Sequence, residues 1–286
     1  MVLWLTVLWL TTGGRMGQCQ GNVSLSPIRF RLSVMLLLML FPLSASANGT
    51  SSWQNAAFIE QAFEQVALKN EYDTKTHRVR KWLAPVSLLI EHDIGDVALH
   101  RQLVDMHLAH LASITGHPMA LVNDSKFANI TLVFTRQSHW HAWVNRLMGP
   151  QASEHLQGAV CIGHFSANSQ GEMQQAFVVI PVDQAVMHGK LVACVVEEIT
   201  QVLGLPNDSD KVYPSIFNDK TPQDLLTGLD GVLLKLLYSD AVKAGMTAAQ
   251  AKPVVHTLVS QYLQDGTVAN ADALIRQGKL YPLLGL

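Results

Sequence analysis

C-V-V-E-E-I-T-Q-V-L-G-L-P-N-D, residues 194–208, is the most informative segment of the chain. Its apolar spacing predicts a helix that ends at Gly204 and is followed by a polar loop. Glu197 and Gln201 are one helical turn apart and therefore share a face, with Glu198 beside them. The segment thus predicts a buried helix that gathers two carboxylates and an amide, and these residues are the candidate site.

The spacing of these polar residues resembles the metallopeptidase pattern H-E-x-x-H-x-x-G-x-x-H. In that pattern, histidines four residues apart bind zinc, and the glutamate is the general base. Aligned with the pattern, the three histidine positions hold Glu197, Gln201 and Asn207, whereas Glu198 and Gly204 match. The resemblance implies a zincin-like, more narrowly metzincin-like, fold. It also implies that Glu198 would be the catalytic base if the protein were active.

Two later segments extend the resemblance. The loop 215–217 falls where a metzincin has its Met-turn, without the methionine, and 225–238 is similar to the helix that closes matrixin-type metallopeptidases. The combination of C-x-x-E-E-x-x-Q-x-L-G-L-P-N-D, S-I-F-N-D and L-T-x-x-D also resembles an uncharacterised bacterial family. Members of that family are exported proteins or putative lipoproteins that carry a domain of unknown function. The signature covers residues 194–246 best and the rest of the mature chain loosely.

The missing histidines decide how the site is interpreted. Neutral imidazole is a good zinc ligand, whereas the amide oxygen of glutamine or asparagine is a weak one. The candidate ligands are Glu197, Glu198, Gln201, Asn207 and Asp208. This oxygen-only set suits calcium or magnesium better than zinc. Because nothing in the spacing requires a cation, the same groups could simply hydrogen-bond neighbouring strands and the following loop. We therefore expect no zinc, and either no cofactor or a hard divalent cation such as calcium.

The composition excludes one class of partner. The 286 residues carry a formal net charge of −2, and the lysines and arginines are scattered along the chain. A nucleic-acid-binding surface is expected to show a basic patch, so we predict no nucleic-acid partner. Hydrophobic residues make up 49% of the chain, which is enough to bury a sizeable core.

The N-terminus has the organisation of an export signal. Arg29 and Arg31 precede the apolar run 34–43, and the small residues that follow end in Ala47. This order of basic, apolar and small residues predicts a signal peptide that is cleaved after Ala47. Residues 1–47 are therefore expected to be a leader, and 48–286 a single zincin-like domain. The mature protein would then be exported to the periplasm or the extracellular space.

The leader leaves an alternative open. Residues 1–28, which include a second apolar run at 2–10, are an unusual prefix to a signal peptide. Either translation starts downstream of Met1, which we favour, or the chain begins with an additional hydrophobic segment. An uncleaved leader would anchor the protein in the membrane, and we expect no other membrane contact. Cys19 lacks the preceding residues of a lipobox, so the lipoprotein character of the similar family does not transfer.

The mature chain contains two cysteines, Cys161 and Cys194. An even number of cysteines in an exported protein favours a disulfide, which here would clamp the candidate helix to the segment before it. Two separate buried thiols are the alternative.

The remaining elements alternate strands and helices in the first half and are mostly helical afterwards. The expected strands are 78–83, 86–90, 121–122, 128–134 and 176–182. The expected helices are 58–68, 97–114, 139–148, 188–203, one that starts near Thr227 and ends by Gly245, 253–264 and 271–277. This order predicts an α+β fold in which a mixed sheet packs on the candidate helix, with a helical C-terminal part.

Three histidines, His100, His107 and His110, broadly share one face of the expected helix 97–114. His107 and His110 have a spacing that could chelate a metal. Because apolar residues lie between them, we expect a wet or half-buried row instead.

Three functional hypotheses follow. The first is a non-catalytic protein whose degenerate peptidase cleft binds a peptide or a protein partner in the cell envelope, and we favour it. The second is an unconventional metal-dependent hydrolase, with oxygen ligands holding a hard cation and Glu198 as general base. The third is a structural envelope interaction module in which the polar cluster only supports the fold.

Overall fold

The computed structural model describes residues 52–69, 77–156, 158–221 and 223–286. The expected leader, with its cleavage site, lies outside these residues. Within the described ranges, no helix is both long and apolar enough to cross a membrane.

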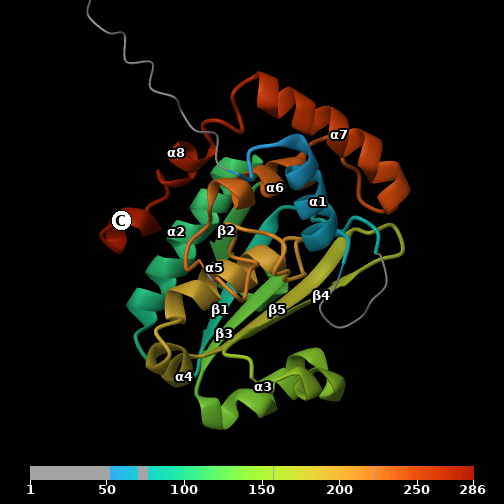
Figure 1. Ribbon diagram of the computed structural model, residues 1–286. Helices are drawn as coiled ribbons and strands as arrows, with labels where there is room; N and C mark the ends of the chain where they lie inside the picture. The colour runs from blue at the N-terminus through green and yellow to red at the C-terminus, as the bar shows by residue number, and fades with distance from the viewer. Residues whose placement is uncertain (1–51, 70–76, 157, 222) are drawn as a thin grey trace, which may run out of the picture. The chain divides into compact units, whose positions relative to one another are not determined.

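A five-stranded mixed sheet runs through the centre of the protein (Figure 1). Its strands are β1 (Val86–His92), β2 (Met119–Val122), β3 (Ile130–Thr135), β4 (Ile162–Ala167) and β5 (Met173–Pro181). In the order β2-β1-β3-β5-β4, the first four strands are parallel and β4 runs antiparallel to β5 at one edge. The central strands read as nearly continuous apolar runs, as expected for parallel strands that are covered on both faces.

Helices cover both faces of the sheet. The α-helices are α1 (Ala56–Ala67), α2 (Val97–Thr115), α3 (Gln137–Met148), α4 (Val182–Met187), α5 (Leu191–Gln201), α6 (Gly228–Tyr238), α7 (Ala248–Gln264), α8 (Ala271–Ile275) and α9 (Leu280–Leu283). Two short 3₁₀ turns occur at Ser125–Phe127 and Pro150–His155. Figure 1 shows α3 on one side of the sheet and α2 and α5 on the other. The sheet with its helices is the α+β architecture that the element order predicts.

Successive side chains of a strand point to opposite faces of the sheet, so the buried side chains form two cores, one on each face. On β3, Val133 packs with Trp140 of α3 in the smaller core. Leu132 and Phe134 belong to the larger core, which also takes in the buried face of α5 and most of α6. The candidate helix therefore lies under the sheet, within the main core.

Three expectations about elements are wrong. The segment 78–83 is not a strand: only Lys81 forms a bridge, with Glu172. The Lys81 ammonium group instead enters the core, where it donates to the backbone oxygens of Leu237, Ser239 and Val242 at 2.6–3.1 Å.

The second and third differences concern helix ends. The expected helix 188–203 is preceded by a separate α4 and begins only at Leu191, because Gly189 turns the chain with a φ of 67°. The expected helix 253–264 begins five residues earlier, at Ala248, after its N-cap Thr247. The helix that starts after Thr227 ends at Tyr238, in agreement with an expected end by Gly245. Strand β4, which is not among the expected strands, forms the antiparallel edge of the sheet.

Candidate functional site

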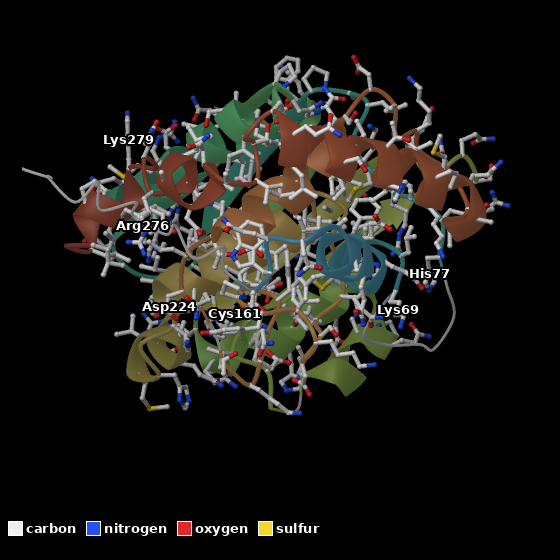
Figure 2. The ribbon with its side chains drawn as sticks, turned by 45° about the horizontal axis from the view of Figure 1, so that its top comes forward. Lys69, His77, Cys161, Asp224, Arg276 and Lys279 are labelled. Carbon is white, nitrogen blue, oxygen red and sulfur yellow. A yellow bond between two sulfur atoms is a disulfide. The ribbon has the colours of Figure 1, made fainter. Side chains whose placement is uncertain are left out.

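Helix α5 is fixed at its N-terminal half by a disulfide. Cys161, just before β4, is bonded to Cys194 with a Cα–Cα distance of 5.9 Å (Figure 2). This confirms the pairing favoured from the cysteine count. The bridge holds the first turns of α5 against the beginning of the edge strand.

Hydrogen bonds from three other elements hold the rest of α5. The His107 Nε2 on α2 lies 3.1 Å from both the Val196 carbonyl and the Thr200 hydroxyl. Beyond the helix end, the Trp82 indole donates to the Val202 carbonyl at 2.9 Å, and the Tyr238 hydroxyl donates to the Leu203 carbonyl at 2.9 Å. These contacts fasten α5 and the turn after it in one position relative to the sheet.

Glu198 lies between α5 and the edge strand. This residue is only 6% exposed. On β4, a Cβ atom at Gly163 would lie 2.7 Å from the Glu198 Oε2 and 3.1 Å from a methyl group of Val202. The glycine therefore makes the space that the carboxylate occupies. Glu198, which matches the general base of the peptidase pattern, sits directly beneath the edge strand.

Glu197 and Gln201 lie on a different part of the helix surface. Both are half-buried, and the Gln201 amide donates to the Asp208 carboxylate at 3.1 Å. Carboxylate oxygens of Glu197, Asp208 and Asp219 all lie within 4.8 Å of one another. Two unit negative charges at that distance repel by roughly 3 kcal/mol at an effective dielectric constant of about 20. A cation placed among the three oxygens would offset that repulsion, and oxygen donors suit calcium or magnesium.

Asn207, at the third ligand position of the peptidase pattern, serves a different purpose. The residue is 7% exposed, and its side-chain amide donates to the carbonyls of Gln65 and Asp208, each at 2.9 Å. Its backbone N–H also donates to the Val66 carbonyl. Asn207 thus ties the loop after α5 to α1. The structure brings Glu197, Gln201 and Asp208 together, but it engages Asn207 elsewhere.

The S-I-F-N-D loop is anchored to α6 by a buried carboxylate. Asp230 accepts a hydrogen bond from the Ser215 hydroxyl at 2.6 Å and another from the Ile216 N–H at 3.2 Å. It also accepts the Thr227 N–H at 2.7 Å, as part of the capping box that starts α6. Burial raises the pKa of Asp230 to about 6, and these hydrogen bonds oppose the rise. The anchored loop carries Asp219 to the acidic cluster.

A match to a known family covers most of the described chain. Residues 56–257 match the family described as "Protein of unknown function (DUF2927)". The chain belongs to the DUF2927 family. Comparison with curated proteins and with solved structures found no match. The DUF2927 domain extends from the first described helix into α7 and contains every candidate site residue.

Sequence reasoning missed Asp219 as a member of the site. The one indication in the sequence is that Asp219 ends the S-I-F-N-D segment, which is part of the family signature together with the candidate helix.

The histidine row is also more buried than expected. His100 and His107 are fully buried, and only His110 is half-buried. The two hydrogen bonds of His107 to α5 show that it supports the candidate helix from α2.

Proposed function

We propose that this chain is an exported, non-catalytic protein that binds extended peptides beside its degenerate metallopeptidase-like site. The observation that carries the proposal is the position of β4. This strand is hydrogen-bonded to β5 on one side, and no described strand pairs with its other side. An open strand edge can accept a peptide as an additional strand, with main-chain hydrogen bonds providing affinity. Gly163 of the same strand covers Glu198, so a peptide bound there would run past the site.

A recess at the far end of β4 supports the same interpretation. It has a volume of about 450 Å³ and is lined by residues that include Arg78, Arg80 and Phe165. The Arg80 guanidinium lies 5.2 Å from the centre of the Phe165 ring. The exposed Arg78 donates to the Gly245 carbonyl at 2.9 Å, and the further N–H donors of its guanidinium group suit a carboxylate. We therefore place an acidic side chain or the C-terminus of the peptide in this recess.

The expected lack of catalysis has a chemical basis. Carboxylate and amide oxygens replace all three nitrogen donors of the peptidase pattern, and Asn207 is committed to the backbone of α1. The proposed protein therefore keeps a helix-and-strand binding arrangement and lacks the ligands that would hold zinc. The same resemblance to metzincins supports a zincin-like fold as part of this proposal.

The test measures binding and cleavage together. Fluorescent, unstructured peptides with a free C-terminal carboxylate are titrated with the full mature chain, binding is followed by fluorescence anisotropy, and the peptides are then analysed by mass spectrometry. We expect saturable binding, intact peptides and roughly tenfold weaker binding in Arg78→Glu. Arg101→Glu, an exposed charge reversal on α2, is the matched control and should bind as the wild type does.

Two results would contradict the proposal. One is the absence of saturable binding to any of the peptides. The other is cleavage that disappears in Glu198→Gln. Export has a separate check, because the mature protein isolated from the producing cell should begin at Asn48.

A second candidate function is favoured by the acidic cluster of Glu197, Asp208 and Asp219. A calcium ion held by these oxygens would support an unconventional hydrolase with Glu198 as the general base, and its carboxylate would then have to move out from beneath Gly163 to reach a water molecule beside the ion. Calorimetric titration with calcium distinguishes this candidate: Asp219→Asn should abolish stoichiometric binding, whereas Asp105→Asn on α2 should leave it unchanged. Calcium-dependent hydrolysis that is lost in Glu198→Gln would replace our first proposal with this one.

A further inference from the structure

Two cavities lie between α2 and the C-terminal helices, on residues that the proposed peptide site does not use. The first has a volume of about 260 Å³ and is bounded by α2, α6 and the segment around α8. The second, of about 240 Å³, lies between α2 and the turn after α8. They share lining residues from both sides, namely His110, Ser113, Leu274 and Gln277. We treat them as one bipartite cavity, the α2–α8 cavity.

His110 is one of three polar residues shared by the two halves. Its ring lies against Gly278, where a Cβ atom would come within 2.4 Å of the Nδ1 atom. Its Nε2 atom is buried and has no hydrogen-bond partner within the described residues. Burial lowers the pKa of His110, so the ring is neutral at neutral pH and can donate from this nitrogen. A buried polar atom without a partner is unfavourable and calls for an explanation, such as a ligand that supplies the missing hydrogen bond.

Lys235 supplies a positive charge to the first half of the cavity. It lies on α6, is half-buried, and makes no ion pair within the described part of the chain. Asp265 interacts with it electrostatically, without an ion-pair contact. At the second half, the exposed Lys279 stands near the red C-terminal helices in Figure 2. The two charged side chains that line the cavity, Lys235 and Lys279, are therefore both positive.

The walls between these polar groups are apolar. Ile114, Val232, Ala271 and Ile275 line the first half, from α2, α6 and α8. Gly231, on the same turn of α6 as Val232, leaves room for Ile275, whose end would lie 2.5 Å from a Cβ atom there. An apolar cavity with a few convergent polar groups is the usual form of a small-molecule site.

We propose that the α2–α8 cavity binds a small amphiphilic monocarboxylate, such as a medium-chain fatty acid. Its carboxylate would accept a hydrogen bond from the His110 Nε2 and pair with Lys235. Its alkyl chain would lie against Val232, Ala271 and Ile275. This site is independent of the proposed peptide function, because it shares no residue with β4 or the acidic cluster.

Octanoate is the probe, and isothermal titration calorimetry of the mature chain is the measurement. We expect one octanoate per chain, with affinity reduced roughly tenfold or more in Lys235→Met and in His110→Phe, because each change removes one charged or hydrogen-bonding contact. Octanol, which has the same chain without the charge, should bind at least about tenfold more weakly.

Leu274→Glu tests the site without disturbing the core, since Leu274 is 47% exposed at the junction of the two halves. The added negative charge should repel octanoate and weaken its binding. Leu263→Glu on α7, at a residue 37% exposed and outside the cavity, is the matched control and should bind octanoate normally. The proposal is overturned if octanoate does not bind, if octanol binds as tightly, or if Lys235→Met and Leu274→Glu both bind with wild-type affinity.

Discussion

At the scale of single residues, Gly163 and Glu198 show how closely the edge strand and the candidate helix fit. The space for the carboxylate exists because the strand residue above it has no side chain. A glycine in a strand otherwise weakens it, so its presence here is explained by this close approach.

Gly163→Ala should destabilise the protein by about 1–3 kcal/mol, because the new methyl group would press on Glu198 and Val202. Chemical denaturation measures the change in the free energy of unfolding. In the double-mutant cycle with Glu198→Ala, the two effects should be less than additive, because the smaller residue relieves the contact. Additive effects would show that the two side chains do not meet.

The pKa of Asp230 leads to a second prediction, on how stability depends on pH. Its pKa rises from 3.8 to about 6 on folding, so it favours the folded state when protonated. That contribution is complete below pH 4 and is lost as the pH rises through about 6, with a total of about 3 kcal/mol. Asp230→Asn should remove this loss, so the stability difference between variant and wild type should shift in favour of the variant between pH 4 and pH 7. The exposed Asp105→Asn is the control, and a difference that does not vary with pH would contradict the assignment.

The sequence predicts the site only in part, and the reasons are local. Helical periodicity is enough to place Glu197 beside Gln201, since one turn separates them. Asn207 follows the helix, and its direction depends on hydrogen bonds to α1, which lies more than a hundred residues earlier in the chain. Asp219 reaches the cluster through the loop anchored by Asp230. Contacts between distant segments of this kind leave no local pattern in a sequence.

At the scale of secondary-structure elements, α5 is held from two directions: a disulfide joins it to Cys161, just before β4, and His107 of α2 hydrogen-bonds to it. The elements with clear periodicity, including α2, β3 and β5, are close to their expected ranges. Strand β4 was missed because Gly163, His164 and Ser166 interrupt its apolar alternation. The segment 78–83 has the alternation of a strand. Its path instead follows the buried hydrogen bonds that Lys81 donates to the Val242 carbonyl and Trp82 donates to the Val202 carbonyl.

Removing the disulfide by Cys161→Ser together with Cys194→Ser should lower the free energy of unfolding by about 3–4 kcal/mol. The bridge joins residues 33 apart in the sequence, and opening it releases that loop in the unfolded chain. Denaturation curves of the double variant and of the wild type in dithiothreitol should coincide. A double variant as stable as the oxidised wild type would show that the bridge does not restrain the fold.

The histidines of α2 should make the fold sensitive to acid. Burial lowers the pKa of His107 to about 3 and that of His100 to about 4, from 6.5. Because the neutral form is favoured in the folded state, this stability is present above pH 6.5 and is lost as the pH falls toward 3. His107→Gln should be less stable than the wild type at pH 7 but lose less stability between pH 6.5 and pH 4. His141→Gln, an exposed histidine on α3, should follow the wild-type curve.

At the scale of the whole molecule, the α+β class follows from the order of strands and helices, and the structure agrees with it. A mixed sheet lies over the candidate helix, with helices at the C-terminal end, as expected. The activity does not follow from this architecture, because one fold can support several chemistries and the site decides among them. In the proposed function, the decisive feature is that the positions aligned with the nitrogen ligands of the peptidase pattern hold Glu197, Gln201 and Asn207, whereas Glu198 matches its glutamate.

Metal analysis of the purified protein, combined with a peptide-hydrolysis assay, tests that feature most directly. The account predicts no stoichiometric zinc and no hydrolysis, even after incubation with zinc. One zinc ion per chain, together with peptidase activity that Glu198→Gln abolishes, would contradict it.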